Sequence, residues 1–583
     1  MPATRVTVAS NTKQSQKAPL LIPSTASADP CVTPSCFSFV IKTAQTKLRL
    51  KRASRVFVHG GRELIKAQDW VDVLKDDATF LVSTGEEYVG SKKEEAFARS
   101  EQGGEDVTVE VDPKCPVELL ADKTFVDPLS VTQLETVART LPGMVHAVGQ
   151  PDLHPGTKFP IGSVFVSKKW IHPPLIGGDI GCGMAWYKTS LSRVQIETDK
   201  GRKIADKLRG LEGAWRTQKA RELWLDDEYD PSASAGVEWD ASLGTIGAGN
   251  HFVEAQVVEE VTMANYLRDN PEPQCQLLEG EVILLVHSGS RGYGSHILKH
   301  FTKDGGRDSI YEDEPLAQQY LEAHDRACAW ASRNRDLIAL RFLACLEPGD
   351  QSWDLGINDT NSSEDVEARL IIKARHDVQA RKVVDIYHNN LEHRDWPPSR
   401  QNVNPEGVQP DISPPIINDT GKAYIHRKGA APTYNRVTNQ PLTILPLPGS
   451  RATPTLILHP LFTSLNQNGH LNALSLAHGA GRALSRAKAA TYVSQKYSSK
   501  AEDLLRGDFV RSDRHGNKRH EHETGRDVHG GCWVVCEMKD LVWEEAPEAY
   551  KDVWDVGDDL VKKGCAERWG WCRGRVSYKV RKE

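Results

Sequence analysis

The chain has few of the features that mark membrane, secreted or repetitive proteins. Its longest apolar runs fall well short of the about 18 residues that a membrane-spanning helix needs, and its N-terminus carries no cleavable signal with an apolar core. Only 11 of its 583 residues are cysteine, at irregular spacing, and no fixed-period repeat is visible. We therefore expect no disulfide framework and no membrane association, and we predict a reduced intracellular compartment, either cytosol or nucleus.

The chain also lacks a strong excess of charge of either sign. Its 73 Lys and Arg face 79 Asp and Glu, a formal net charge of −6, and 39% of its residues are hydrophobic. This composition is typical of a folded globular protein and excludes a wholly disordered chain or a generally cationic nucleic-acid coat. A local basic groove stays open, because the field that attracts phosphate depends on where the charges lie.

Four segments are expected along the chain. Residues 1–36 have no aromatic side chain and predict a disordered tail. Residues 37–90 combine short β-branched runs that predict strands, among them FSFVIKT, with a turn at Gly60-Gly61 and one helical run, AQDWVDVLKD. This order predicts a small β-grasp module. Its pieces VFVHGGREL and LVSTGEEYVG resemble a doublecortin-type ubiquitin-like domain, so this module could hold a protein partner. A charged linker (91–116) and the main body (117–583), with a polar insertion near 500–529, follow.

The main body mixes two kinds of pattern. Apolar residues at helical spacing predict helices over 316–345 and 364–387, whereas the apolar runs 282–287 and 454–459 predict buried strands. The proline-rich stretch 396–415 predicts a loop. The fold class expected is α+β.

Short islands rich in glycine and histidine are the most informative feature of the body. They are PDLHPGTKFPIGS, IGGDIGCGMAW, LGTIGAGNHFVE, VHSGSRGYGS, DIYHNNLE and LAHGAGRALSR. Small residues next to donor side chains are needed where a backbone approaches a metal or a phosphate closely. Each island alone is ambiguous, since a single histidine is more often a satisfied polar group than a ligand.

Together the islands offer a mixed set of donors. Asp179 and Cys182 lie three residues apart in a glycine-flanked loop, and His251, His287 and His388 each end or follow a short apolar run. A thiolate, a carboxylate and imidazoles suit Mn, Zn, Fe or Co better than Mg or Ca. We therefore predict a metal site, although Cys182 by itself could be a small buried hydrophobe.

Five of these motifs, in this order, resemble one known family. DIGCGM, GNHFVE, VHSGSRGYG, the HN of YHNN and HGAGR are similar to the RtcB family of RNA-splicing ligases, from about Val117 to the C-terminus. The resemblance implies an RtcB-like body with a central metal and nucleotide cleft. It also implies a ligase that uses GTP and two Mn²⁺ to join RNA ends bearing a 3′-phosphate or a 2′,3′-cyclic phosphate to 5′-hydroxyl ends, through a guanylylated histidine and an RNA-3′-guanylyl intermediate.

The resemblance also assigns roles to residues. It places one metal on Asp179, Cys182 and His251, and the other on Cys182, His287 and His388. It makes His478 of HGAGR the nucleophile and Asp152 its partner, which agrees with the need for a neutral imidazole held in one tautomer. The nucleotide contacts that we carry over or infer are Asn250, Phe252, Glu254, Arg291, Asn389, Ser450, Gly479, Ala480, Gly481, Arg482, Tyr550 and Lys579. Among them, Glu254 is expected to read the guanine edge and Phe252 and Tyr550 to stack on its faces.

Departures from the family pattern and rival functions leave some questions open. Ala477 and Asn390 stand where the family more often has serine and tyrosine, and the N-terminal extension and the 500–529 insertion leave the substrate RNA undetermined. A dinuclear metal phosphoesterase acting on RNA ends would use the same ligands without His478, and an RNA-binding adaptor would need none of them.

Arg291, Arg427 and Arg482 are the candidates for RNA phosphate contacts. Cys532 and Cys536 with His529 could hold zinc, but their C-x₃-C spacing favours buried thiols.

Overall fold

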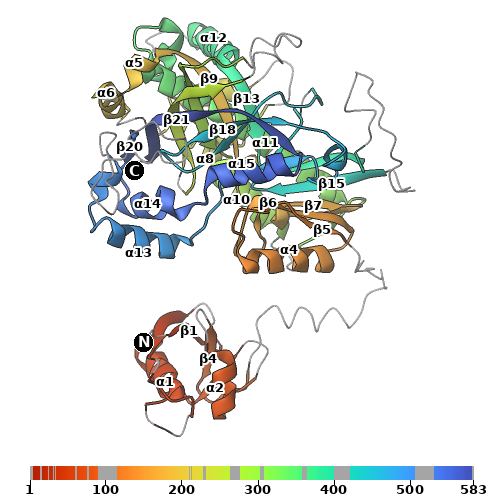
Figure 1. The fold of residues 1–583 in the computed structure, drawn as a ribbon, viewed down its shortest axis with the longest axis vertical. Coiled ribbons are helices and arrows are strands. Elements are labelled where there is room, and N and C mark those ends of the chain that lie inside the picture. Colours follow the sequence, from red (N-terminus) through yellow and green to blue (C-terminus); the bar gives the residue numbers. More distant parts are fainter. Residues whose placement is uncertain are drawn as a thin grey trace. The chain divides into compact units, whose positions relative to one another are not determined.

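The computed structural model divides the chain into two compact units, residues 1–108 and 109–583. The structure describes residues 4–12, 16–23, 25–29, 32, 34–58, 62–74, 78–88, 115–197, 199–208, 211, 213–226, 232–247, 249–262, 276–302, 308–357, 364–398, 421–436, 438–505 and 531–580. Figure 1 shows the fold of each unit. The expected turn at Gly60-Gly61, most of the proline-rich stretch and most of the polar insertion lie outside the described residues.

Among its described residues, the N-terminal unit forms a four-stranded mixed sheet with two helices. Its strands lie in the order β2-β1-β4-β3, with β1 parallel to β4 and the other pairs antiparallel. The elements are β1 (Thr4–Ser10), β2 (Lys17–Ile22), α1 (Cys36–Lys47), β3 (Arg55–Phe57), α2 (Ala67–Val73) and β4 (Thr79–Ser83). The helices and the sheet share one core, in which Trp70, Val40 and Phe80 are fully buried.

Two sequence expectations for this unit are wrong. Residues 1–36 are not a disordered tail, since β1 and β2 form one side of the sheet and bury Val6, Val8 and Ile22. The run FSFVIKT is part of α1 rather than a strand, because Ser35 caps the helix and buried residues recur every four positions at 36, 40 and 44. The tail expectation failed because β-branched Val and Ile can fill a strand face without any aromatic residue.

The body is built on an eight-stranded sheet. Seven strands lie in the order β13-β9-β11-β10-β21-β18-β17, and β20 pairs with β21 outside this path. The bounds are β9 (Gly183–Ser192), β10 (Phe252–Val261), β11 (Glu281–Ser288), β13 (Lys382–Tyr387), β17 (Leu445–Pro448), β18 (Thr455–Pro460), β20 (Trp533–Cys536) and β21 (Ala566–Val580). The strands predicted at 282–287 and 454–459 are thereby confirmed.

A five-stranded sheet, in the order β14-β15-β7-β6-β5, accompanies the large one. Its members are β5 (Val117–Leu119), β6 (Met144–His154), β7 (Ile161–Ser167), β14 (Asn389–Trp396) and β15 (Gly421–Lys428), and α4 (Pro128–Thr140) lies against them (Figure 1). Two small pairs complete the strands: β8 (Trp170–Ile171) with β12 (Ile310–Tyr311), and β16 (Ala430–Pro432) with β19 (Ser475–Ala477).

The helix predicted over 316–345 is confirmed as α11 (Pro315–Leu346). The helix predicted over 364–387 is too long, because α12 (Glu364–Arg381) ends where β13 begins and Val383, Val384 and Ile386 pack in the sheet core. The remaining helices are α5 (Arg193–Ile196), α6 (Asp199–Lys207), α7 (Gln218–Leu225), α8 (Val237–Asp240), α10 (Arg291–Thr302), α13 (Arg486–Lys496), α14 (Lys539–Glu544) and α15 (Val553–Lys562). Short 3₁₀ turns are η1 (Pro173–Leu175), η3 (Gln351–Gly356), η5 (Gln467–Gly469), η6 (Ala501–Leu504) and η7 (Pro547–Ala549).

The large sheet is buried on both faces, which explains why its strands are apolar runs. On β11, Leu284 and Val286 pack in the core that contains α11, whereas Ile283 and Leu285 pack in the core that contains the five-stranded sheet. Alternate residues of a strand point to opposite faces, so both faces must be apolar. The mixture of helices and strands makes the fold α+β, as predicted. Among the described residues, no helix combines the length and the apolar character needed to cross a membrane.

Candidate active site

Four strands of the large sheet bring the predicted metal ligands to one of its ends. β13 ends and β9 begins at the paired residues Tyr387 and Gly183. β11 ends beside them, with His287 opposite both Met184 of β9 and Phe252 of β10. The loop with Asp179 and Cys182 precedes β9, His251 precedes β10 and His388 follows β13, so all five residues meet at this end.

Asp179, Cys182 and His251 converge on one point. The Nε2 atom of His251 lies 2.8 Å from Oδ2 of Asp179 and 3.2 Å from Sγ of Cys182. Its Nδ1 lies 3.0 Å from the carbonyl oxygen of Ile246, which fixes the tautomer that leaves the lone pair on Nε2. A carboxylate, a sulfur and an imidazole lone pair therefore face one another, an arrangement that a cation between them stabilises.

His287 and His388 extend this cluster. His287 Nε2 lies 3.5 Å from Sγ of Cys182, and the rings of His287 and His388 are 5.0 Å apart. Cys182, His251 and His287 offer donor atoms that all lie within 4.8 Å of one another. Among the described residues, the buried Nδ1 atoms of His287 and His388 and Oδ1 of Asp179 have no hydrogen-bond partner.

Burial sets the protonation of these groups. It lowers the pKa values of His287 and His388 well below the usual range, and the neighbouring histidines lower them further, so both rings are neutral. Burial and the adjacent Asp179 carboxylate raise the pKa of Cys182 well above its usual range. A divalent cation would displace the thiol proton, because metals bind the thiolate. The donor set fits a soft-to-intermediate divalent metal such as Mn²⁺ or Zn²⁺.

The glycines of the islands permit this close packing. A Cβ atom on Gly289 would lie 2.3 Å from Oδ1 of Asp179, and one on Gly183 would lie 1.9 Å from the carbonyl oxygen of Ile386. Either approach is far inside van der Waals distance, so a side chain at these positions would push the Asp179 loop or β13 away from the cluster.

His478 lies next to the metal cluster and is held by Asp152. Its Nδ1 is 2.7 Å from Oδ2 of Asp152, which is fully buried in β6. The ring of His478 is 4.6 Å from that of His388. Because Asp152 accepts the Nδ1 proton, the lone pair is left on Nε2, as a nucleophilic imidazole needs.

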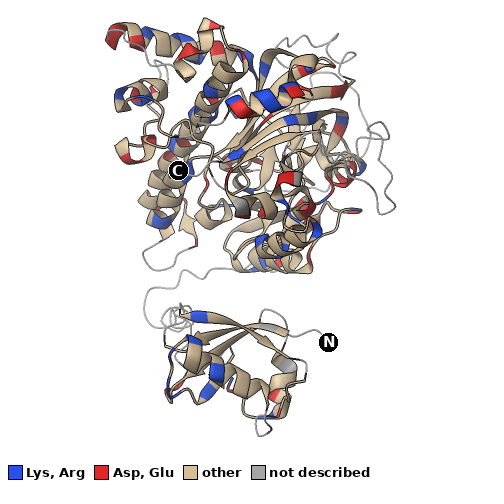
Figure 2. Ribbon diagram, turned by 90° about the vertical axis from the view of Figure 1, so that its left-hand side faces the viewer, with Lys and Arg blue, Asp and Glu red and all other residues tan. Residues whose placement is uncertain are grey.

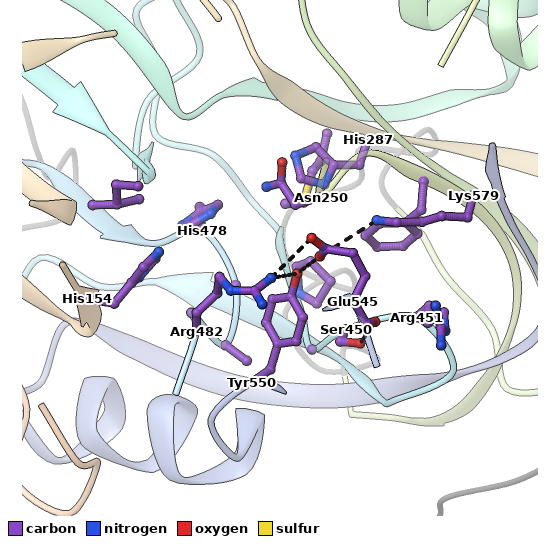
Figure 3. Close-up of a pocket in the computed structure, with 18 of the residues that line it drawn as sticks. His154, Asn250, His287, Ser450, Arg451, His478, Arg482, Glu545, Tyr550 and Lys579 are labelled. Carbon is purple, nitrogen blue, oxygen red and sulfur yellow. Dashed lines mark hydrogen bonds and ion pairs between the residues drawn. The ribbon is translucent and has the colours of Figure 1, made fainter. Parts of the chain in front are cut away.

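A pocket opens beside His478, and His287 of the cluster also lines it (Figure 3). Nine of the twelve predicted nucleotide contacts line it: Asn250, Phe252, Ser450, Gly479, Ala480, Gly481, Arg482, Tyr550 and Lys579. Among the other lining residues are His154, Met184, His287, Arg451, Arg486 and Glu545. The pocket thus joins His478, one proposed metal ligand and several cations.

Glu545 is the centre of the charged side of the pocket. Its carboxylate lies 3.1 Å from Arg482, 3.5 Å from Arg486 and 3.9 Å from Lys579. It also accepts a hydrogen bond from the hydroxyl of Tyr550, and the guanidinium of Arg482 lies over the Tyr550 ring (Figure 3). With three cations around one carboxylate, the pocket keeps an excess of positive charge for an anionic ligand.

Three predicted nucleotide contacts lie elsewhere. The carboxylate of Glu254 is buried behind the pocket and accepts hydrogen bonds from the backbone of Ala452 and the side chain of Gln256, both at 2.9 Å. Glu254 therefore already has hydrogen-bond partners within the protein, and it is not among the residues that line the pocket.

Arg291 and Asn389 lie beside the metal loop. Arg291 donates to Thr245 at 3.2 Å. Burial opposes the ionisation of Asp179, but His251, Cys182 and the charge of Arg291 together keep its pKa low. Asn389 donates to the carbonyl oxygen of Asp179 at 3.2 Å and accepts from the backbone of Gly429 at 2.9 Å. Arg291 and Asn389 therefore support the loop that carries the ligands.

Arg427 does not face a binding surface, contrary to the expectation from the sequence. It is fully buried in β15, 2.9 Å from Glu392, and donates to Ser475 at 2.7 Å. A cation that already has a buried carboxylate partner is part of the core, since separating the pair would leave a buried charge.

The sequence analysis missed three residues at the site. His154 lines the pocket and is held through Nδ1 by the backbone of Asp152; it stands in the first island, so the signal was available. Lys428, whose pKa burial lowers to about 8, packs against the position of Gly177 in the metal loop. Glu545 has no glycine or histidine neighbours, and nothing in its local sequence distinguishes it.

The described part of the possible zinc site is apolar. Cys532 and Cys536 pack with Val534, Leu541 and Val542, and burial raises the pKa values of both thiols. His529 lies outside the described residues.

Comparison with known proteins places the chain in a family. The sequence profile described as tRNA-splicing ligase RtcB matches residues 133–222 and 212–515. The chain is 31% identical to RNA-splicing ligase RtcB2 of Escherichia coli over 446 residues, 76% of this chain and 90% of that protein. It is 23% identical to the tRNA-splicing ligase RtcB of Methanococcus maripaludis (76% and 91% covered) and 26% identical to that of Thermococcus kodakarensis (78% and 92% covered). The chain belongs to the RtcB family, as its motifs predicted.

Proposed function

We propose that this protein is a GTP- and Mn²⁺-dependent RNA ligase that joins 3′-phosphate or 2′,3′-cyclic phosphate ends to 5′-hydroxyl ends, in tRNA splicing or RNA repair. The names of its relatives, which are RNA- or tRNA-splicing ligases, support this activity. The observation that carries the proposal is the position of His478, which lies next to the cluster of donor side chains and lines a cationic pocket, with Asp152 accepting a hydrogen bond from its Nδ1.

The roles of the chain's own residues follow from this position. Nε2 of His478 attacks the α-phosphorus of GTP, a nitrogen–phosphorus bond forms, and pyrophosphate leaves. An oxygen of the RNA 3′-phosphate then attacks the same phosphorus and releases His478. Finally the 5′-hydroxyl attacks the 3′-phosphate, with loss of GMP. A cyclic phosphate end is first opened by water. Asp152 accepts a hydrogen bond from Nδ1–H of His478 throughout and stabilises the positive charge that develops on the ring.

Two metal ions fit the donors in the way that the family resemblance implies. Asp179, Cys182 and His251 hold one, and Cys182, His287 and His388 hold the other. Bound divalent cations supply charge stabilisation for the phosphate oxygens and orient the attacking and leaving groups. The protein contributes neutral imidazoles and a thiol whose proton a metal can displace. These groups lie close together, on a loop that neighbouring side chains support.

The pocket supplies the nucleotide site. Phe252 and Tyr550 offer aromatic faces for the base, and the ammonium group of Lys579 lies 6.0 Å from the centre of the Phe252 ring. Arg482 and Lys579 offer positive charge, while the glycines on either side of Ala480 leave room for phosphate next to His478. Asn250 and Ser450 are uncharged polar groups at the wall.

The remaining expectations are proposals of the same kind. We propose that the N-terminal unit is a β-grasp module, which its mixed sheet with parallel central strands and a helix after β2 supports. We also propose a reducing compartment. Each of the nine cysteines that the structure describes is a free thiol, the form that a metal-binding role for Cys182 requires.

Two rival functions predict different chemistry. A dinuclear metal phosphoesterase would release phosphate from RNA ends without GTP, and an RNA-binding adaptor would have no need of the ligands. Their grouping, together with the Asp152–His478 pair, favours the ligase over both, since neither rival needs a nucleophile with a fixed tautomer.

The test is covalent labelling. The protein is incubated with Mn²⁺ and GTP labelled at the α-phosphate, and we expect label on His478, located by mass spectrometry of the digested protein. His478→Ala should lose the label but keep bound metal and GTP, whereas His296→Ala, on the exposed side of α10, serves as the matched control and should label normally. An unlabelled parent protein, or a labelled His478→Ala variant, would refute the assignment.

A further inference from the structure

Basic and acidic residues are separated in the N-terminal unit. Residues 1–62 contain ten lysines and arginines but only one carboxylate, Asp29, whereas residues 63–88 contain seven Asp and Glu. Residues 1–88 thus carry a net charge of +4, and residues 115–583 carry −7. A random solvated surface would interleave the two signs, so the separation calls for an explanation.

The lysines and arginines of this unit cluster near the C-terminal end of α1. Lys42, Lys47, Arg49, Lys51 and Arg52 are all exposed, on α1 and the turn that leads to β3; we call these five residues the basic patch. Blue segments outnumber red ones on this unit in Figure 2. Lys47 donates to the carbonyl oxygen of Pro19 at 3.2 Å and Gln16 to that of Leu48 at 2.7 Å, which brings the start of β2, with the exposed Lys17, to the same place.

Among the described residues, none provides a counter-ion for the basic patch. Within the part of the N-terminal unit that is described, the ion pairs are those of Arg55 with Glu63 and Glu87, and no residue of the basic patch takes part in one. The positive charge of Lys47 is stabilised by the partial negative charge at the C-terminal end of α1. This interaction does not explain the charges of Arg49, Lys51 and Arg52, which follow the helix.

We propose that the basic patch binds the phosphate backbone of the RNA substrate, an inference that rests on the proposed function of the body. The sign and density of the charge fit a polyanion. The patch itself contains no aromatic side chain on which a base could stack, so binding is independent of RNA sequence and sensitive to salt. The N-terminal unit adds phosphate contacts to a chain whose larger part is acidic, and so raises RNA affinity without taking part in the chemistry.

The test compares two four-fold variants of the full chain. One, Lys47→Gln/Arg49→Gln/Lys51→Gln/Arg52→Gln, removes most of the patch. The control, Lys200→Gln/Arg202→Gln/Lys203→Gln/Lys207→Gln, removes the same number of exposed charges from α6 of the body. The probe is a long unstructured RNA with hydroxyl groups at both ends, which cannot be ligated, and its binding is followed by fluorescence anisotropy from about 50 to 200 mM salt.

We expect the patch variant to lose at least about tenfold in affinity at low salt. Its slope of log K against log salt should shrink by about 0.7 for each RNA phosphate that the variant no longer neutralises. The α6 control should bind like the parent. Equal affinities and slopes for the patch variant and the parent would overturn the proposal, as would an equal loss in the control. Unchanged RNA binding together with lost binding to phosphatidylserine vesicles, or to an acidic protein, would assign the patch to that partner instead.

The same preparations separate this inference from the proposed function. GMP labelling of the patch variant should equal that of the parent, because His478 and its surroundings are untouched. If no preparation labels, the proposed ligase chemistry fails, while the effect of the patch on RNA affinity can still be measured and judged.

Discussion

Two groups of side chains near His478 differ in charge. In the first group Asp179, Cys182 and the histidines bring together donors that are neutral or negative, with buried nitrogen and oxygen atoms that have no partner among the described residues. In the second group Arg482, Arg486 and Lys579 surround the single carboxylate of Glu545. The first group suits cations and the second suits an anion, as the proposed binding of GTP and divalent metal ions beside His478 requires.

The two groups also differ in how their charges are neutralised or compensated. By shifting their pKa values, burial keeps the imidazoles of His287 and His388 neutral and the thiol of Cys182 protonated, so these three groups carry no charge before a cation binds. The pocket side cannot use this route, because arginine does not lose its proton, and it relies on Glu545 instead. Four substitutions can test this difference.

Loss of the thiol should have the largest effect. Cys182→Ser removes the one donor shared by both proposed metal positions, and a hydroxyl is a poor replacement for a thiolate. Loss of a residue that only supports a metal ligand costs up to about 100-fold in metal affinity. We expect Cys182→Ser to lose more than this and to show no labelling with GMP. Metal content by mass spectrometry checks this, with circular dichroism to verify the fold; full metal content and normal labelling would contradict the bridging role.

Reversing the tautomer of His478 should rank second. In Asp152→Asn the amide donates to Nδ1 and leaves the proton on Nε2, which removes the nucleophilic lone pair. We expect the rate of GMP labelling to fall by about 10³ to 10⁴-fold with metal content unchanged. A variant that labels at the parent's rate would show that Asp152 has no role in orienting the ring.

Neutralising Glu545 should have an intermediate effect. Glu545→Gln leaves the buried Lys579 and the half-buried Arg482 without a counter-charge, so we expect a loss of about 3 kcal/mol in stability without ligand. An anion can then replace the missing carboxylate. GTP should therefore raise the melting temperature of this variant more than that of the parent. A smaller shift than in the parent would indicate that Glu545 binds the nucleotide directly.

The smallest effect should be a pH dependence from Lys579. Burial lowers its pKa to about 8, so it loses its charge as pH rises through that value and the pocket loses one cation. We expect the KM for GTP to rise by up to about tenfold between pH 7 and pH 9. Lys579→Arg, which stays charged, should abolish this rise. An unchanged pH profile in that variant would place the titrating group elsewhere.

Much of the site was predictable because most islands combine a donor with a glycine that its packing requires. Asp179 and Cys182 share one loop, and His251, His287 and His388 stand at strand ends that the apolar runs already marked. Once those strands align in one sheet, their ends meet, and the prediction that the donors form one cluster is supported by the distances. Most of the predicted nucleotide contacts also lie at the pocket wall.

The errors share a physical cause. Arg427, expected on the surface, is buried because β15 pairs with β14 and brings Glu392 beside it. The role of Glu254 stays a prediction; its carboxylate does not line the pocket and accepts a hydrogen bond from Ala452, almost two hundred residues away. In the N-terminal unit, β1 becomes ordered by pairing with β4, which follows it by some seventy residues.

The sequence by itself determined the donor types, the family and the apolar strands, since these depend on residue identity and on spacing within about ten positions. The tertiary structure alone decided which charges are satisfied. Glu545 gathers Arg482, Arg486, Tyr550 and Lys579 from separate segments, while Arg49, Lys51 and Arg52 of the N-terminal unit gain no ion pair among the described residues. Local spacing cannot reveal either outcome, because the energy of a charge depends on its burial and on the neighbours that the fold places around it.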